Sequence, residues 1–317
     1  MPELPEVEVV RHGLAPAITG ATITSVRVLD ERSLRRHDGP AEDFIDRLTG
    51  ARIDSAVRRG KFLWMPVAVG DAAPAGGTGA FGDPIEAVVV HLGMSGQVLL
   101  RSVDEEVAPL TRIVLGVAHP HHGDLRVDFV DQRIFGSMAL DALARTPDGA
   151  PGGYGSTLPL VPGQVAHIAR DPLDPAFDDA RFLAALRSRR TGIKRALLDQ
   201  GLISGIGNIY ADESLWAARL HYDQPTWSIS TRKARELLGE VRAVLRRALE
   251  EGGTSFDAQY VNVNGASGYF SHSLRAYGQH GTPCSRCGRM LVREQFMNRG
   301  SHYCPRCQRL RAVRGAA

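Results

Sequence analysis

Four cysteines near the C-terminus restrict the fold of this chain more than any other feature. Cys284 and Cys287 form one C-x2-C pair, Cys304 and Cys307 form a second, and 16 residues separate the pairs. This spacing is typical of a tetrahedral zinc site. Two disulfides would satisfy the same count, but a reducing cytosol argues against them. The segment has too few apolar residues to fold alone, so we expect one structural Zn²⁺ bound by four thiolates and doing no chemistry.

The cysteine segment is also strongly basic. Residues 271–317 contain nine Arg, no Lys and the single acidic residue Glu294, which gives +8, whereas the whole chain has a net charge of +3 and the remainder therefore −5. A basic tail on a slightly acidic body favours a polyanionic partner, usually nucleic acid. Taken alone, such a charge run also fits a solvated face.

Length and composition indicate a globular protein. A chain of 317 residues has room for two domains, and its hydrophobic content of 43% and charged content of 23% are ordinary for soluble proteins. Neither an apolar run of membrane-spanning length nor a signal-peptide pattern is present. We therefore expect a cytoplasmic protein with no membrane partner.

The first eight residues, MPELPEVE, contain a candidate nucleophile. If Met1 is removed, Pro2 carries a free secondary amine, and α-amines have a pKa of about 7.7–8.0. Glu3 and Glu6 lie close in sequence, and an amine flanked by carboxylates can form a Schiff base. Pro5 suits the first turn of a helix that presents Val7, Val10 and Leu14 on one face. On these residues alone, a proline-marked helix start with acidic residues is equally consistent.

The next 110 residues predict an antiparallel sheet. Short strand-like runs are separated by turn residues, with no helical pattern of any length between them, which favours a β-sandwich or barrel. The expected strands are 21–29, 52–57, 61–67, 87–90, 97–101, 112–117 and 125–130. Residues 68–84 and 119–124 are expected to be surface loops.

Beyond a Gly- and Pro-rich stretch at 146–165 the pattern becomes helical. We expect helices at 179–189, 192–200, 211–219 and 231–251, followed by a β-hairpin that contains the cysteines. The segment Gly205–Ala211 fits the dinucleotide pattern G-x-G-x-x-A. That pattern requires a preceding strand, and the residues before it are helical in character. A glycine turn between helices, with N–H groups that can bind phosphate, is the better interpretation.

The motif PELPEVE resembles the N-terminal signature of the formamidopyrimidine-DNA glycosylase family, which comprises bacterial repair enzymes for oxidised purines. Further blocks follow in that family's order: RRGKFL, HLGMSG, DQRIFG, LISGIGNIYADESLWAARLH, VNVNGASGYF and the cysteine hairpin. The resemblance implies an α+β fold with an N-terminal helix and β-sandwich, then a helix–two-turn–helix domain and a zinc finger. The corresponding boundaries are 1–145 for the catalytic domain, 146–170 for a hinge, 171–270 for the helical domain, 271–310 for the zinc finger and 311–317 for a disordered tail.

The same resemblance implies the activity and its residues. The chain would act in base excision repair as a monomeric, nucleoid-associated DNA glycosylase and AP lyase on duplex DNA containing 8-oxoguanine or a formamidopyrimidine. Pro2 would be the nucleophile and Glu3 the proton donor, with Lys61 and Arg299 also in the catalytic set. Residues implied to contact DNA are His91, Met94, Arg133, Phe135, Asn208, Tyr277 and Arg299. Met94, Arg133 and Phe135 would fill the gap left by the extruded base.

Departures from the family pattern are local. Gln132 and Ile134 stand where the family often has Pro and Arg, which removes one stiffening residue and one cation from that loop. Residues 265–270 match a loop that closes over the extruded base, although individual contacts are not assignable. Arg189, Arg190 and Lys194 would add general attraction to the DNA backbone.

Three alternatives remain at this stage. The sister enzyme endonuclease VIII, which acts on oxidised pyrimidines, shares the architecture and the N-terminal amine. A non-catalytic zinc-finger protein that binds damaged DNA is a second alternative, although it would not need a terminal proline beside a glutamate. A remote third is an oxidoreductase that uses the Gly205–Ala211 loop.

Overall fold

A computed structural model describes residues 2–68, 86–254 and 270–312. The described chain divides into two compact units, each with its own hydrophobic core. The first unit contains Pro2 and Glu6–His167, and the second contains Glu3–Pro5, Ile168–Thr254 and residues 270–312. The short segment Glu3–Pro5 thus belongs to a unit whose other residues lie more than 160 positions away in sequence.

The first unit combines helix α1 (Leu4–Ile18) with an antiparallel sheet. Val7, Val10 and Leu14 of α1 are buried, which confirms the apolar face expected from their spacing. The strands are β1 (Thr22–Val28), β2 (Arg52–Ile53), β3 (Val57–Arg59), β4 (Phe62–Ala68), β5 (Glu86–His91), β6 (Gly96–Arg101), β7 (Thr111–His119), β8 (Gly123–Asp131), β9 (Ser137–Arg145) and β10 (Leu160–Pro162). Short 3₁₀ helices η1 (Glu31–Leu34) and η2 (Gly163–Val165) and helix α2 (Ala41–Leu48) complete the unit.

The strand order is β10-β9-β5-β4-β2-β1-β7-β8-β6, with β3 paired to β4 outside this path. Every pairing between the described strands is antiparallel, as the short alternating runs predict. The register places His91 opposite both Phe62 and Ser137, and Gly96 opposite Asp131. The turns after β5 and after β8 therefore emerge from strands whose positions are fixed by pairing on the sheet.

Some elements differ from the sequence-based expectation. The expectation of no helix between the strands is wrong, because α2 buries Phe44 and Leu48. Strand β9 was not expected, and β10 lies within the stretch 146–165, where no periodicity was visible. β10 pairs with β9 from Leu160 opposite Arg145 to Pro162 opposite Leu143. The expected loop at 68–84 lies outside the described residues, apart from Ala68, which is the last residue of β4.

The second unit is helical, as predicted. It contains α3 (Asp179–Ser188), α4 (Ile193–Leu198), α5 (Asn208–Ala217), η3 (Thr226–Ser228), α6 (Thr231–Glu250) and η4 (Phe270–Ser273). Side chains cap two of these helices, since Asp178 accepts from the N–H of Arg181 at α3 and Ser230 from that of Lys233 at α6. Helix α5 begins three residues earlier than expected, at Asn208. It is almost wholly buried and therefore occupies the centre of this unit.

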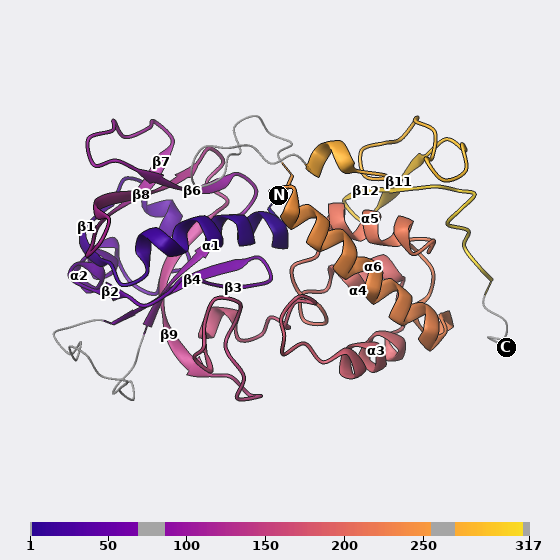
Figure 1. Ribbon diagram of the computed structural model, residues 1–317, viewed down its shortest axis with the longest axis horizontal. Helices are drawn as coiled ribbons and strands as arrows, with labels where there is room; N and C mark the ends of the chain where they lie inside the picture. Colours follow the sequence, from indigo (N-terminus) through magenta and orange to yellow (C-terminus); the bar gives the residue numbers. More distant parts are fainter. Residues whose placement is uncertain (1, 69–85, 255–269, 313–317) are drawn as a thin grey trace. The chain divides into compact units, whose positions relative to one another are not determined.

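The hairpin of β11 (Val292–Phe296) and β12 (Arg299–Tyr303), drawn in yellow in Figure 1, holds the last two strands of the described chain. Leu291, Cys284 and Cys304 form a small separate core with Trp216 packed against it. Among the described residues, none of the helices is long and apolar enough to span a bilayer.

Candidate functional site

Glu3 is held at the N-terminus of α5. Its carboxylate accepts the backbone N–H groups of Gly207 at 2.6 Å, Ile209 at 3.0 Å and Tyr210 at 3.4 Å, and the residue is only 2% exposed. The first N–H groups of a helix have no partner within the helix and carry partial positive charge, so they bind a carboxylate well. Glu3 is therefore fixed in position by an element about 200 residues further along the chain.

The glycine turn before α5 makes this docking sterically possible. A Cβ on Gly207 would collide with the Glu3 side chain, and one on Gly205 would lie 2.7 Å from Leu4 Cβ. Gly205 also has φ +88, and its carbonyl accepts the N–H of Leu4 at 3.0 Å. The motif that resembles a dinucleotide fingerprint thus accommodates the residues that follow Pro2.

Two loops of the first unit are joined by Asp131. This fully buried carboxylate accepts from Ser95 Oγ at 2.5 Å, from the N–H of Arg133 at 3.1 Å and from the N–H of Gly136 at 2.6 Å. Gly93 lies so close to the backbone of Phe135 that a Cβ there would clash. The loop 92–96 and the loop 131–136 are consequently one rigid structure.

Large apolar side chains protrude from both of these loops. Met94 is 45% exposed and Phe135 is 50% exposed, although the chain has a large core in which either could be buried. Arg133, in the second of these loops, is also exposed. The structure therefore places on adjoining loops the three residues for which the family resemblance implies a gap-filling role.

Arg35 supports this loop pair, and sequence reasoning missed it. Its guanidinium donates to the carbonyl oxygens of Ile134 at 3.0 Å and Gly136 at 2.6 Å, and also to that of Phe135. Ile134 has φ +54, a conformation that a β-branched residue adopts only when its surroundings enforce it. Nothing in the sequence connects Arg35 to a loop a hundred residues away.

His91 is neutral at physiological pH. Burial, and after it the positive charges of Arg36, Lys61 and Arg35, lower the pKa of His91 to about 4. Its Nδ1 accepts the N–H of Gly93 at 3.1 Å, which leaves the proton on Nε2. His91 can therefore donate one hydrogen bond through Nε2 without carrying charge.

The basic block Arg58–Lys61 is not the exposed hairpin that its composition suggests. Arg58 is 1% exposed and Arg59 is 5% exposed. Arg58 Nε donates to Glu8 at 2.8 Å, and Arg59 Nε donates to the carbonyl of Gly152 at 2.7 Å. Only Lys61, at the turn between β3 and β4, is partly exposed.

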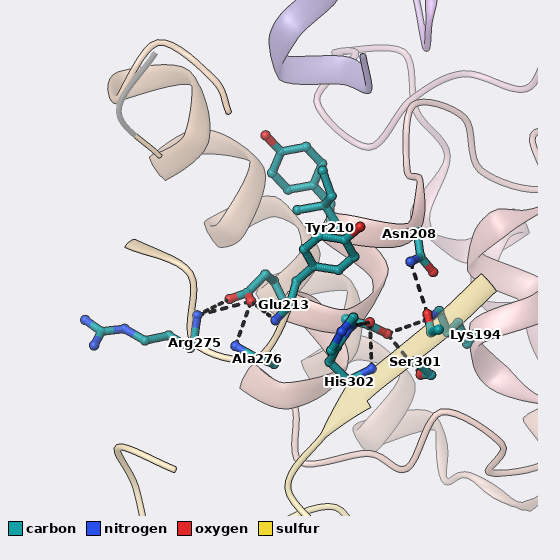
Figure 2. A network of polar contacts seen from close by, with 12 residues as sticks. Lys194, Asn208, Tyr210, Glu213, Arg275, Ala276, Ser301 and His302 are labelled. Carbon is teal, nitrogen blue, oxygen red and sulfur yellow. Dashed lines mark hydrogen bonds and ion pairs between the residues drawn. The ribbon is translucent and has the colours of Figure 1, made fainter. Parts of the chain in front are cut away.

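Helix α5 binds the C-terminal segment through two consecutive buried carboxylates (Figure 2). Asp212 pairs with Lys194 Nζ at 2.6 Å, with both side chains at most 1% exposed, and accepts the N–H of His302 at 2.8 Å and Ser301 Oγ at 3.1 Å. Glu213 accepts the N–H groups of Arg275, Ala276 and Tyr277 at 2.8–3.1 Å. Burial raises the pKa of Glu213, and these three donors oppose the shift.

Asn208 and Lys194 both fix the residue next to Arg299. Asn208 Nδ2 donates to the Gly300 carbonyl at 3.1 Å and Lys194 Nζ donates to it at 3.2 Å. Burial raises the pKa of Tyr277, and a side-chain hydrogen bond with Asn208 opposes this shift. Asn208, Tyr277 and the base of the hairpin thus form one cluster in the second unit, and Arg299 projects from it, exposed. The expectation that Lys194 adds general attraction to DNA is weakened, because this ammonium is fully buried.

The four cysteines form a compact cluster. Their Sγ atoms all lie within 4.8 Å of one another, and Cys287 Sγ is 3.5 Å from Cys304 Sγ. Tetrahedral Zn²⁺ with Zn–S bonds of about 2.3 Å places sulfurs about 3.8 Å apart, which this arrangement matches. Burial and the neighbouring thiols raise the pKa of Cys304 and that of Cys307, the latter to about 12. A dication would stabilise the thiolates that this crowding disfavours, so the residues fit a structural zinc ion.

Parts of the expected site lie outside the described residues. Met1 and residues 265–269 of the expected capping loop belong to this part of the chain. Phe270 is described and buried, with its ring centroid 5.7 Å from that of Tyr210.

Solved structures of known function share this architecture. A crystal structure of a Lactococcus lactis FPG mutant with Fapy-dG-containing DNA superposes with a TM-score of 0.77 at 29% identity, covering 97% of this chain and 100% of that one. The structure of L. lactis FPG with abasic-site DNA gives 0.75, covering 97% and 99%. With its four-cysteine hairpin, helical unit and docked Glu3, the chain is a zinc-finger DNA glycosylase.

Sequence comparisons then specify the family. Residues 1–138 match the formamidopyrimidine-DNA glycosylase N-terminal domain, 168–259 the formamidopyrimidine-DNA glycosylase H2TH domain, and 281–310 the zinc finger found in FPG and IleRS. The formamidopyrimidine-DNA glycosylase of Leifsonia xyli is 63% identical over 98% of this chain and 100% of the relative. That of Kineococcus radiotolerans is 53% identical over 97% of each. The chain belongs to the formamidopyrimidine-DNA glycosylase family.

Proposed function

We propose that this enzyme excises oxidised purines, 8-oxoguanine and formamidopyrimidines, from duplex DNA and then cuts the strand, using Pro2 as an amine nucleophile. The observation that carries the proposal is the immobilised carboxylate of Glu3, directly after Pro2, held by three N–H groups of α5. A carboxylate fixed this firmly beside a terminal amine suits repeated proton transfers at one carbon centre.

The chemistry follows from an amine that attacks a sugar. The lone pair of the Pro2 nitrogen attacks C1′ and the bond from C1′ to the base breaks, and the base leaves with the proton that the Pro2 nitrogen gives up. Glu3 protonates the ring oxygen as the sugar opens, which yields an iminium between Pro2 and C1′. The iminium acidifies the C2′ proton, which passes to the Glu3 carboxylate, so β-elimination expels the 3′ phosphate. A following δ-elimination expels the 5′ phosphate.

The protruding loops of the first unit provide gap-filling groups. Extruding a nucleotide costs a few kcal/mol, and less for a damaged or poorly paired base. Met94 and Phe135, both about half exposed on loops joined by Asp131, would enter the vacated stack. Arg133, on the same loop, would hydrogen-bond the orphaned cytosine.

The remaining predicted contacts are assigned to phosphates of double-stranded DNA. Lys61 and Arg299 would contribute charge near the lesion, whereas His91, Asn208 and Tyr277 would donate neutral hydrogen bonds. For His91 this role agrees with its lowered pKa, because Nε2 keeps its proton while the ring stays neutral.

An endonuclease VIII-type preference for oxidised pyrimidines is the competing proposal. The L. lactis FPG has also been solved with oxidised-pyrimidine-containing DNA, at a TM-score of 0.75 and 29% identity. The N-terminal signature and the Arg133/Phe135 pair favour the purine enzyme. Predominant cleavage of a thymine-glycol:A duplex over an 8-oxoguanine:C duplex would reverse this choice.

Borohydride trapping tests the proposal directly. An enzyme that forms an iminium gives a covalent protein–DNA adduct on an 8-oxoguanine:C duplex, whereas a non-catalytic binder gives none. The variant Pro2→Gly is expected to slow base excision strongly while leaving DNA affinity nearly unchanged. Loss of affinity instead would mean that Pro2 acts structurally.

The proposed organisation keeps the boundaries expected from sequence: a catalytic domain at 1–145, a hinge at 146–170, a helical domain at 171–270, a zinc finger at 271–310 and a tail at 311–317. We assign the enzyme to the cytoplasm, associated with the nucleoid, as a monomer acting in base excision repair.

A further inference from the structure

The tip of the C-terminal hairpin has an unusual conformation. Phe296 pairs with Arg299, so Met297 and Asn298 form a two-residue loop between β11 and β12. Met297 has φ +54, in the left-handed region that favours glycine or asparagine. Asn298, which tolerates that region well, follows one position later. The chain thus places a long apolar residue where glycine would be conformationally easier.

The Met297 side chain does not compensate by packing in the protein. It is 52% exposed, and Asn298 and Arg299 beside it are exposed as well. The residues on either side of this triplet are buried. Phe296 lies under Lys194 Nζ, 5.0 Å from its ring centroid, and the Gly300 carbonyl accepts from Lys194 and Asn208. The tip is therefore a short protrusion on a firmly held base.

The chemistry of the tip fits a DNA groove. Arg293 and Arg299 provide two positive charges, and Arg299 Nε lies 3.4 Å from Asn298 Oδ1. The nearby acid, Glu294, is occupied by the hydroxyls of Tyr222 and Tyr303, each at 2.6 Å. A cation and an amide next to an exposed apolar side chain are the groups with which proteins contact phosphates, base edges and sugar faces together.

We infer that Met297 is a DNA-contacting residue, which packs its side chain against sugar and base surfaces in the groove of the bound duplex beside Arg299. A non-glycine residue in a disfavoured conformation points to a role for its side chain. The inference rests on the proposed function, because it requires the hairpin tip to face damaged DNA.

Substitution of Met297 by glycine separates this role from a structural one. M297G relaxes the backbone, so thermal stability is expected to stay equal or rise. Affinity for a duplex carrying a tetrahydrofuran abasic-site analogue is expected to fall about fivefold. The reason is that glycine removes the roughly half of a methionine side chain that would be buried against the DNA. The slope of log affinity against log salt is expected to stay unchanged, because no phosphate contact is lost.

Matched variants complete the test. M297L keeps an apolar side chain and is expected to retain affinity. M290G makes the same substitution at a methionine that is 55% exposed near the zinc ligands, and it is expected to leave affinity unchanged. Wild-type affinity in M297G, or an equal loss in M290G, would overturn the inference. Cleavage of an 8-oxoguanine:C duplex by the wild-type enzyme is measured alongside, so failure of the proposed function shows separately as an inactive wild type.

Discussion

His91 shows how single residues in this enzyme obtain their chemical state from neighbours. A histidine that is expected to contact phosphate would ordinarily be considered a cation. Here burial and the charges of Arg36, Lys61 and Arg35 lower its pKa to about 4, and the N–H of Gly93 occupies its Nδ1. The side chain is thus a neutral donor with its one hydrogen on Nε2, so it can form a directed hydrogen bond without adding charge.

Protonation of His91 should make stability depend on pH. The folded-state pKa of about 4 lies below the usual 6.5, so the unfolded chain binds the proton more readily. Stability is therefore complete above pH 6.5 and is lost as pH falls from 6.5 towards 4, by up to about 3 kcal/mol. Denaturant unfolding between pH 4 and 7.5 measures this loss. The variant His91→Gln should show a shallower dependence over that window, and a parallel profile would contradict the assignment.

Among the elements, α5 has several functions at once. Its first N–H groups hold Glu3, and Asn208 in its first turn binds the hairpin. Asp212 binds the hairpin between the two cysteine pairs, and Glu213 binds a segment that precedes them. Because these groups lie on one helix, α5 positions both the Glu3 carboxylate and the base of the β11–β12 hairpin. Displacement of α5 would therefore disturb Glu3 and Arg299 together.

The effects on stability of substituting Asp212 and Lys194, which form a buried ion pair, should be strongly coupled. Removing one partner of a buried pair leaves the other charge unpaired, so K194M and D212N are each expected to destabilise the protein by roughly 3–5 kcal/mol. The double variant K194M/D212N removes both charges, while the asparagine oxygen can still accept the N–H of His302. The double variant should lose clearly less free energy of unfolding than the two single variants lose in sum.

Urea unfolding of the four proteins measures this coupling. Zinc content, determined in parallel, should stay at one ion per chain, because neither residue lies in the cysteine cluster. Additive losses of stability would contradict a direct electrostatic interaction between the two side chains.

Elements with strong local signals were predictable, and those determined by distant contacts were not. Helix α6 has an apolar face and a Ser230 cap, and its position was predicted to within one residue. Strand β9 has the sequence SMALDALAR, whose Ala and Leu favour a helix, and it becomes a strand because it pairs with β5 and β10. Helix α2 was missed because only eight residues carry its pattern.

The candidate site shows the same division. Motifs identified Glu3, Asn208 and the four cysteines, but they did not reveal how Glu3 is held or that Lys194 is buried against Asp212. Arg35 was missed because its three acceptors are backbone carbonyls about a hundred residues away, and carbonyl groups leave no signature in a sequence. Tertiary hydrogen bonds to the backbone were therefore the main part of the site that the sequence could not predict.

At the scale of the whole molecule, the two units should contribute independently to the salt dependence of DNA binding. Each phosphate neutralised by a cation adds about 0.9 to the slope of log affinity against log salt. Lys61 lies in the first unit and Arg299 in the second, so K61M and R299A should each reduce the slope by about 0.9, and the double variant by about 1.8. H91Q should weaken binding without changing the slope, because His91 is neutral at pH 7.5.

Fluorescence anisotropy of a labelled abasic-analogue duplex between 50 and 300 mM salt measures all four variants. A reduced slope in H91Q would mean that the bound phosphate restores the proton to the ring, and an unchanged slope in K61M would remove Lys61 from the phosphate contacts.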